Sequence, residues 1–304
     1  MHNRIIIIGG PTASYKSELA LLIASRFDSC VINADSMQIY KELPIISAQP
    51  SNDEKGKCQH YLYGHLDAES NYSVANWLNE SINIIHHAHQ QGKIPIIVGG
   101  TGLYIHALVK GLATIPLIEN ATKIYCQEQL ATLGYEGVYK FLVNIDAQIL
   151  QKIHHNDKQR ILRAFEVYIQ TNISIFEHHK QTKAPFYLEQ FFYIVSNLNR
   201  EDLYFRCDKR VEMMISLGAI DEVKNFSKQN LNHQSAIFNT IGVKPIQKFI
   251  AGELLLNEAV KLWQQETRNF AKRQTTWFKN QLIYLNKYNY MNHQDLDKIS
   301  KNII

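Results

Sequence analysis

Short apolar runs and amphipathic stretches alternate through the N-terminal part of the chain. The runs at 4–8, 30–34 and 94–98 are rich in isoleucine and valine, which is typical of buried parallel strands. The stretches at 16–27 and 74–91 repeat their apolar residues at helical spacing. Because strands that alternate with helices form parallel sheets with crossover helices, this part is predicted to have an α/β fold.

The pattern changes near Leu112, where predominantly helical segments without obvious strands begin. A buried strand is predicted again at 191–195. The middle section is therefore interpreted as a helical domain, 113–185, inserted into a core made of 1–112 and 186–304. After the last strand, helices are predicted at 203–217, 219–228 and 256–281.

Composition restricts the class of protein. The 304 residues are 45% hydrophobic and carry 32 basic and 28 acidic side chains, a net charge of +4, so contact with nucleic acid would depend on local clusters of charge. The four cysteines are far apart in the sequence, which favours reduced thiols over disulfides or zinc. Without a run of about eighteen apolar residues or a signal-peptide core, the chain is expected to be soluble and cytoplasmic.

The first strand is followed by a sequence that is typical of a phosphate-binding loop. In such a P-loop the backbone N–H groups and the start of a helix converge on a phosphate, Lys16 adds positive charge, and Ser17 can ligate Mg²⁺. Tyr15 stands where the second glycine of this motif is expected, at a position with positive φ, which costs a residue with a Cβ roughly 1–2 kcal/mol. The loop residues are Gly10, Pro11, Thr12, Ala13, Ser14, Tyr15, Lys16 and Ser17.

Two further strand ends carry polar residues. Asp35 ends the second strand and Thr101 follows the third in a Gly-Gly-Thr-Gly turn. The carboxyl ends of parallel strands face the ligand crevice, so both residues should lie near the loop. Asp35 is interpreted as a general base or a carboxylate near Mg²⁺, and a helix N-cap is the alternative.

Basic residues cluster in the predicted insertion. Lys158, Arg160 and Arg163 lie within two helical turns, and the two arginines share a helix face. A solvated helix face and a surface for phosphates and bases are equally compatible with this cluster. The chain has many histidines, but their spacing is not that of a metal site, and none is assigned a catalytic role.

A second basic surface is predicted on the last helix. At ~100° per residue, four cations fall within ~40° of one another, with three aromatic residues on the opposite side. The aromatic side is expected to be core, and the cations, with no acid among them, suggest a polyanion. The cations are Lys261, Arg268, Lys272 and Lys279, and the aromatic residues are Trp263, Phe270 and Trp277.

Taken together and in this order, the motifs resemble the tRNA dimethylallyltransferase family, also called tRNA isopentenyltransferases, over nearly the full length. The matching stretches are Gly-Pro-Thr-Ala-Ser at 10–14 with Lys16 and Ser17, Asp-Ser-Met-Gln-Ile-Tyr at 35–40, Tyr-Ser-Val-Ala at 72–75, Gly-Gly-Thr-Gly-Leu-Tyr at 99–104, Asn-Asp-Lys-Gln-Arg at 156–160, Arg-Ala-Phe-Glu-Val at 163–167, and Ala-Lys-Arg-Gln at 271–274 with Thr276 and Trp277. Their joint order is highly specific.

The resemblance implies a P-loop-type parallel sheet with flanking helices, an inserted helical domain, and a transferase that acts as a monomer. The family moves a dimethylallyl group from its pyrophosphate to N6 of the adenosine beside the anticodon, in tRNAs that read codons beginning with U. The loop would then hold the donor's pyrophosphate, so its ATP-binding motif would not mean ATP hydrolysis. Thr12, Lys16, Arg206 and Ser17 with Mg²⁺ would neutralise the leaving group, and Asp35 would take the proton.

The same resemblance implies contacts with the anticodon arm of tRNA, and the basic side of the last helix adds three candidates. Backbone contacts would set affinity, while an extruded base would set the chemistry. The predicted tRNA-binding residues are Asp35, Ser36, Met37, Gln38, Thr101, Lys123, Gln159, Arg160, Ile161, Leu162, Arg163, Arg268, Lys272 and Arg273.

The chain departs from the family pattern at two positions on the donor side. Tyr15 replaces glycine, and Gln49, in Pro-Ile-Ile-Ser-Ala-Gln-Pro at 44–50, replaces a lysine. We hypothesise that both weaken pyrophosphate affinity, which Tyr15→Gly combined with Gln49→Lys should restore. Two alternatives stay open: a P-loop kinase of a small molecule, and a catalytically impaired homologue that only binds tRNA.

Overall fold

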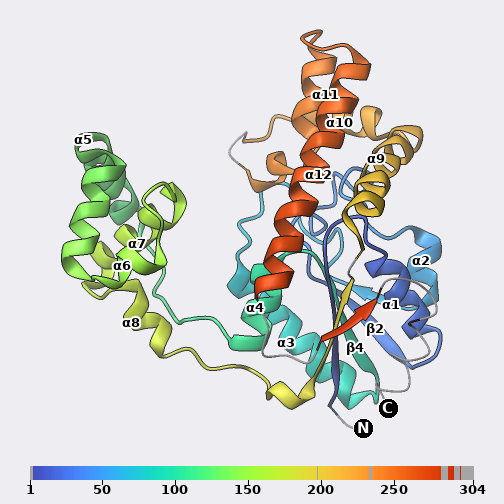
Figure 1. Ribbon diagram of the computed structural model, residues 1–304, viewed down its shortest axis with the longest axis horizontal. Coiled ribbons are helices and arrows are strands. Elements are labelled where there is room, and N and C mark those ends of the chain that lie inside the picture. The colour runs from blue at the N-terminus through green and yellow to red at the C-terminus, as the bar shows by residue number, and fades with distance from the viewer. Residues whose placement is uncertain (1–2, 197, 233–234, 282–286, 291–294, 296–304) are drawn as a thin grey trace. The chain divides into compact units, whose positions relative to one another are not determined.

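The structure is a computed structural model that describes residues 3–196, 198–232, 235–281, 287–290 and 295. It divides into two compact units, one made of Met1–Val109 with Phe186–Ile304 and the other of Lys110–Pro185 (Figure 1). The sequence placed the limits of the insertion at 113 and 185. Within the described residues, no helix has the length and apolar character needed to span a bilayer.

The larger unit is built on a parallel sheet with strand order β3-β2-β4-β1-β5-β6, which confirms the predicted fold class. Four of the strands are those expected from the apolar runs. The short β3 and the edge strand β6 lack such runs and were not predicted. The strands are β1 (Ile5–Gly9), β2 (Ser29–Asn33), β3 (Gln59–Tyr61), β4 (Ile94–Gly99), β5 (Phe191–Ser196) and β6 (Lys287–Tyr290).

Strand register brings the candidate loops together. Gly9 at the end of β1 pairs with Gly99 of β4 and with Val195 of β5, and Asn33 at the end of β2 pairs with Val98. The loops that follow β1, β2 and β4 therefore leave the sheet at the same edge. This edge is where parallel α/β sheets bind ligands.

Four helices accompany the first strands: α1 (Lys16–Ala24), α2 (Asn52–Lys57), α3 (Val74–Gln90) and α4 (Gly102–Lys110). α1 packs its apolar face on the sheet in a buried cluster that includes Ile8, Leu19, Ile23 and Ile96. α3 begins where the sequence predicted, because the Ser73 hydroxyl accepts a hydrogen bond from the N–H of Asn76.

A second set of helices follows β5: α9 (Arg200–Ser216), α10 (Ala219–Ser227), α11 (Val243–Ile250) and α12 (Leu256–Asn280). Figure 1 shows α9 and α12 running alongside each other. Trp263 of α12 and Phe226 of α10 are buried in a cluster that also holds Tyr40 from the segment after β2. This packing fixes the long helices beside the ligand edge of the sheet.

The inserted unit is helical, as predicted, and consists of α5 (Asn120–Ile145), α6 (Gln148–Lys152), α7 (Lys158–Thr171) and α8 (Ile175–Lys180). α5 is kinked at Gly134, which has φ 66° and ψ 171°. The unit has its own core, in which Leu142 of α5 meets Ile161 and Phe165 of α7.

Candidate active site

The loop after β1 has the conformation of an anion-binding nest. Ala13 and Tyr15 have positive φ, 60° and 65°, and the buried Ser14 hydroxyl donates a hydrogen bond to the carbonyl of Pro11 over 2.7 Å. Left-handed residues in such a loop direct backbone N–H groups toward one side, and the start of α1 adds its own N–H groups. The positive φ expected at Tyr15 is therefore confirmed.

Lys16 lies inside this loop. Its ammonium donates to the carbonyl of Pro11 over 2.5 Å. Burial, and to a smaller extent the neighbouring Arg210, lower the pKa of Lys16 to about 7, while Asp35 opposes the shift. An anion bound in the loop would raise this pKa again and restore the full charge.

Two arginines of α9 reach the same loop. Arg206 donates from Nε to the carbonyl of Ala13 over 2.9 Å, and Arg210 donates to the hydroxyl of Thr12. Arg206 was predicted from the resemblance, whereas Arg210 was missed. The available signal was its position one helical turn after Arg206, on the same helix face.

Gln274 of α12 was also missed, although its motif was recognised. The buried amide accepts a hydrogen bond from the N–H of Thr12 over 2.8 Å and donates to the carbonyl of Gly100 over 2.9 Å. It therefore joins the loop after β1 to the loop after β4. The N–H of Thr12 is used in this contact, so the remaining loop N–H groups are the ones available to an anion.

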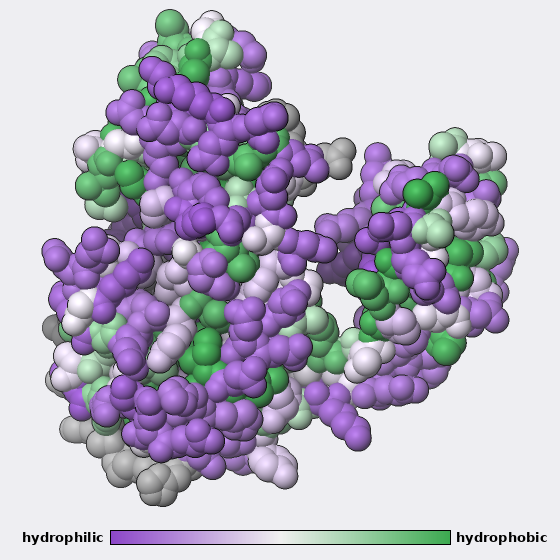
Figure 2. Space-filling model, turned by 180° about the vertical axis from the view of Figure 1, so that it is seen from behind, coloured by the Kyte–Doolittle hydropathy of each residue, from purple (hydrophilic) through white to green (hydrophobic). Residues whose placement is uncertain are grey.

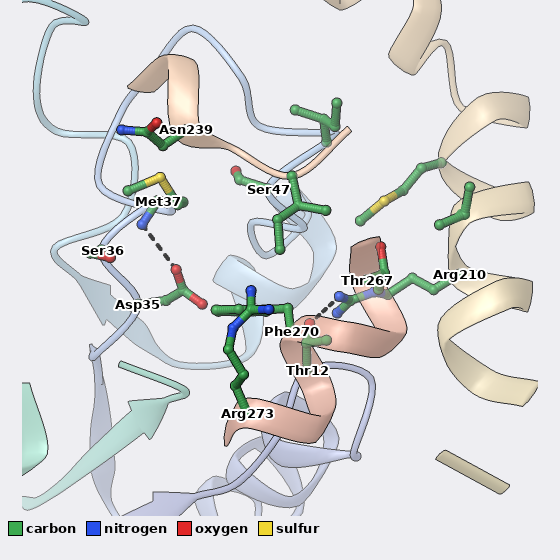
Figure 3. Close-up of a pocket in the computed structure, with 14 residues that line it drawn as sticks. Thr12, Asp35, Ser36, Met37, Ser47, Arg210, Asn239, Thr267, Phe270 and Arg273 are labelled. Atoms are coloured by element: carbon green, nitrogen blue, oxygen red, sulfur yellow. Dashed lines mark hydrogen bonds between the residues drawn. The ribbon is translucent and has the colours of Figure 1, made fainter. Parts of the chain in front are cut away.

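Asp35 lies two residues after the end of β2, and one of its carboxylate oxygens accepts a hydrogen bond within its own turn. Oδ1 accepts from the N–H of Met37 over 2.9 Å. The side-chain amide of the buried Asn33 donates to the carbonyl of Asp35 and accepts from its N–H, which fixes the backbone of Asp35. No helix begins at this point, so the N-cap alternative is wrong. Figure 3 shows the carboxylate directed into a pocket that it shares with Thr12, Phe270 and Arg273.

Thr101 and Gln38 hold the walls of the site in place. The Thr101 hydroxyl accepts from the N–H of Ser36 over 2.9 Å, and the Gln38 amide donates to the carbonyls of Ser47 and Ala48. The carboxylate of Glu222 on α10 accepts from two backbone N–H groups of the same wall, at Ile45 and Ile46, over 2.7 and 2.8 Å. Ser36, Gln38 and Thr101, which were predicted to contact tRNA, therefore also form hydrogen bonds within the protein that hold this wall.

Two cavities meet at these residues. One has a volume of about 260 Å³ and the other of about 850 Å³. The smaller continues to Ser36, Met37, Phe270 and Arg273, and the larger continues along the P-loop to Ser17, Gln49 and Arg206. The residues that line both cavities are Thr12, Asp35, Ser47, Arg210 and Met214.

Among the described residues, no cluster of three or more histidine, cysteine or acidic side chains could hold a metal ion. Ser17 is an exposed residue and lines the larger cavity beside the loop. Because Mg²⁺ keeps several waters and is commonly held by one or two protein ligands plus substrate phosphates, Ser17 fits a metal that arrives with a pyrophosphate.

The predicted tRNA-binding residues of α7 divide into exposed and buried ones. Gln159, Arg160 and Arg163 are exposed, and so is Lys123 on α5. Ile161 is fully buried in the core of the inserted unit, so the prediction that its side chain contacts tRNA is wrong. Its apolar spacing with Ala164 and Phe165 was the available signal. Leu162 also packs against this core and is half-buried.

The surface of the inserted unit matches this division. Figure 2 shows mainly hydrophilic residues on the visible face of the unit, with small hydrophobic groups between them. The two arginines of α7 have acidic neighbours, Asp157 at 3.3 Å from Arg160 and Glu166 at 3.8 Å from Arg163. Ion pairs with an exposed arginine contribute little to stability, so the arginines can exchange them for phosphates.

The basic side of α12 differs from the prediction at one position. Arg268 forms a 2.5 Å ion pair with Asp208 of α9, whereas Lys272 and Arg273 are exposed. The expectation that no acid balances these cations is therefore wrong for Arg268. The aromatic side is also not uniformly core: Trp263 is buried, but Phe270 lines the smaller cavity.

The chain is similar in sequence to known tRNA dimethylallyltransferases. The IPP transferase family model matches residues 38–281. The chain is 37% identical over 284 residues to a tRNA dimethylallyltransferase of Pelagibacter ubique, covering 92% of this chain and 90% of the relative. It is 40% identical over 282 residues to a tRNA dimethylallyltransferase of Wolbachia pipientis wMel, covering 92% and 94%.

Solved structures agree with the sequence relatives. A eukaryotic dimethylallyltransferase acting on tRNA superposes with a TM-score of 0.84 at 28% identity, over 99% of this chain and 77% of that one. A tRNA delta(2)-isopentenylpyrophosphate transferase from Staphylococcus epidermidis gives a TM-score of 0.68 at 31% identity, over 98% of both chains.

Proposed function

The chain belongs to the IPP transferase family and is an enzyme of the tRNA-prenylating type, and on this premise we propose how its site works. The donor is dimethylallyl pyrophosphate, and the acceptor is N6 of the adenosine beside the anticodon in tRNAs that read codons beginning with U. The observation that carries the proposal is the pair of cavities that meet at Asp35 and Thr12.

The larger cavity suits the donor. Its P-loop and Arg206 would bind the pyrophosphate, and Lys16 would regain its proton beside the anion. Ser17 would hold Mg²⁺, whose charge assists departure of the leaving group. Met214, which lines both cavities, offers an apolar contact for the dimethylallyl group where it approaches the acceptor.

The smaller cavity suits an extruded adenine. Phe270 offers a face for stacking, and Asp35 has a second carboxylate oxygen that its turn does not use. The N6 nitrogen attacks the allylic carbon, the bond from that carbon to pyrophosphate breaks, and Asp35 takes the proton from N6. Holding the two substrates from opposite sides of Asp35 supplies the alignment that a weak nucleophile needs.

The remaining tRNA contacts would come from two surfaces. In the inserted domain, 113–185, the exposed residues Lys123, Gln159, Arg160 and Arg163 would meet phosphates of the anticodon arm, and Lys272 and Arg273 would do so from α12. We propose that the protein acts as a monomer. A tRNA substrate favours the cytoplasm as its place of action.

The proposal is tested by incubating the purified protein with unmodified tRNA, Mg²⁺ and dimethylallyl pyrophosphate, followed by mass spectrometry of the nucleosides. Dimethylallyl adenosine is expected only at the position beside the anticodon. Release of ADP from ATP with a small acceptor would instead support the kinase alternative. Tight tRNA binding without any prenylated adenosine would support the impaired homologue.

A further inference from the structure

Tyr15, the residue that departs from the P-loop pattern, lies against an arginine of the site. The guanidinium carbon of Arg206 is 3.4 Å from the centre of the Tyr15 ring. The ring also packs against the buried cluster between α1 and the sheet. It is therefore held by the core while it supports the arginine.

The contacts of Arg206 leave one side of the guanidinium available. Nε donates to the carbonyl of Ala13 over 2.9 Å, and the flat face lies on the Tyr15 ring. Neither contact uses the terminal nitrogens, which carry the remaining four of the five N–H donors of arginine. Within the part of the chain that the structure describes, these nitrogens have no other hydrogen-bond partner, and Arg206 lines the larger cavity.

We propose that Tyr15 is a positioning residue for Arg206. The inference rests on the proposed function, in which the terminal nitrogens of Arg206 bind the donor's pyrophosphate. A guanidinium that is already fixed at its face and at Nε loses less side-chain entropy when the anion binds. In this chain the ring thus offsets the conformational cost of a residue with positive φ in the loop.

This role reverses one expectation drawn from the sequence. If Tyr15 only strains the loop, Tyr15→Gly should lower the KM for dimethylallyl pyrophosphate. If the ring positions Arg206, the same substitution should raise that KM even though it relieves the backbone. The Gln49 amide donates to a different part of the wall, the carbonyl of Tyr40, over 2.6 Å. Tyr15→Gly should therefore be tested alone.

The test compares Tyr15→Gly, Tyr15→Leu and Tyr15→Phe, each with Arg206 and with Arg206→Gln. We expect Tyr15→Leu to raise the KM for dimethylallyl pyrophosphate about fivefold, the size of one cation–π contact, with kcat nearly unchanged. Tyr15→Phe keeps the ring and should recover most of this loss. With Arg206→Gln, loss of the ring should have no further effect. Thermal unfolding verifies that each variant is folded.

Calorimetry with inorganic pyrophosphate gives a readout that does not depend on transfer. If the wild-type protein transfers no prenyl group, the proposed function fails, and the calorimetric cycle alone still reports the coupling between Tyr15 and Arg206. The positioning role is overturned if Tyr15→Gly lowers the KM. It is equally overturned if Tyr15→Leu weakens pyrophosphate binding to the same extent in both arginine backgrounds.

Discussion

The guanidinium of Arg210 donates a hydrogen bond to the hydroxyl of Thr12, which lies 198 positions earlier in the chain. Both residues line both cavities. The contact joins α9 to the P-loop at the place where donor and acceptor would meet. Burial lowers the pKa of Arg210, an effect opposed by Asp35, and an arginine retains its charge in such surroundings.

Arg210→Gln removes this cation while keeping a hydrogen-bond donor. Because Arg210 lines both cavities, we propose that it also contacts the departing pyrophosphate. A charge-assisted contact of this kind is worth roughly 2–4 kcal/mol in the transition state, so kcat/KM for dimethylallyl pyrophosphate should fall by about 10²-fold. Steady-state kinetics measures the change. Lys224→Gln, an exposed substitution on α10, is the matched control, and an equal loss in that variant would contradict the assignment.

The pKa of Lys16 makes anion binding depend on pH. With a pKa of about 7, Lys16 is largely neutral at pH 8.5 in the free protein, and a bound pyrophosphate should return the proton. Calorimetry in buffers of different ionisation enthalpy should then show uptake of protons at about pH 8.5 and much less at about pH 6.

The same measurement on Lys16→Met is the control. Subtracting it removes the protons that pyrophosphate itself gains or loses on binding.

The pKa of Lys16 also determines how its contribution to the free energy of unfolding changes with pH. Because the folded pKa is below the unfolded value of 10.5, the unfolded chain binds more protons in this interval, and the contribution of Lys16 to stability rises as the pH increases from about 7 toward 10.5. If the wild-type protein and Lys16→Met take up the same number of protons on binding pyrophosphate, Lys16 does not gain the proton.

Asp35→Asn separates chemistry from structure. Asparagine keeps an oxygen that can accept from the N–H of Met37, so the turn after β2 should survive. Loss of the general base should lower kcat by about 10²–10⁴-fold. Filter binding should show nearly unchanged tRNA affinity. A variant that retains most of its kcat would exclude Asp35 as the base.

Charge reversal at two cations of α12, Lys272 and Arg268, should have different effects. Lys272→Glu changes an exposed cation and should weaken tRNA binding and reduce its salt dependence by about one phosphate contact. Arg268→Glu places a carboxylate beside Asp208 and should mainly destabilise the contact between α9 and α12. Binding titrations at several salt concentrations and thermal unfolding distinguish the two effects. If Arg268→Glu loses as much tRNA affinity as Lys272→Glu and keeps its thermal stability, Arg268 binds tRNA directly.

The sequence was informative where the signal is local. The isoleucine-rich strands, the P-loop with the left-handed Tyr15, and Asp35 at a strand end all follow from short patterns and from the direction of parallel strands. Gln274 and Arg210 could not be assigned this way, since their contacts with Thr12 span 262 and 198 positions and exist only after α9 and α12 pack beside the loop. The ion pair of Arg268 could not be predicted for the same reason, because its partner Asp208 lies on a different helix.

The most direct measurement is a crystal structure of the protein with the unreactive donor analogue dimethylallyl thiopyrophosphate and Mg²⁺. We expect the pyrophosphate to lie in the nest at residues 12–17, in contact with Lys16 and Arg206. The allylic carbon should then point past Thr12 toward Asp35. A pyrophosphate bound elsewhere, or an allylic carbon turned away from Asp35, would show that the P-loop and Asp35 do not have these roles.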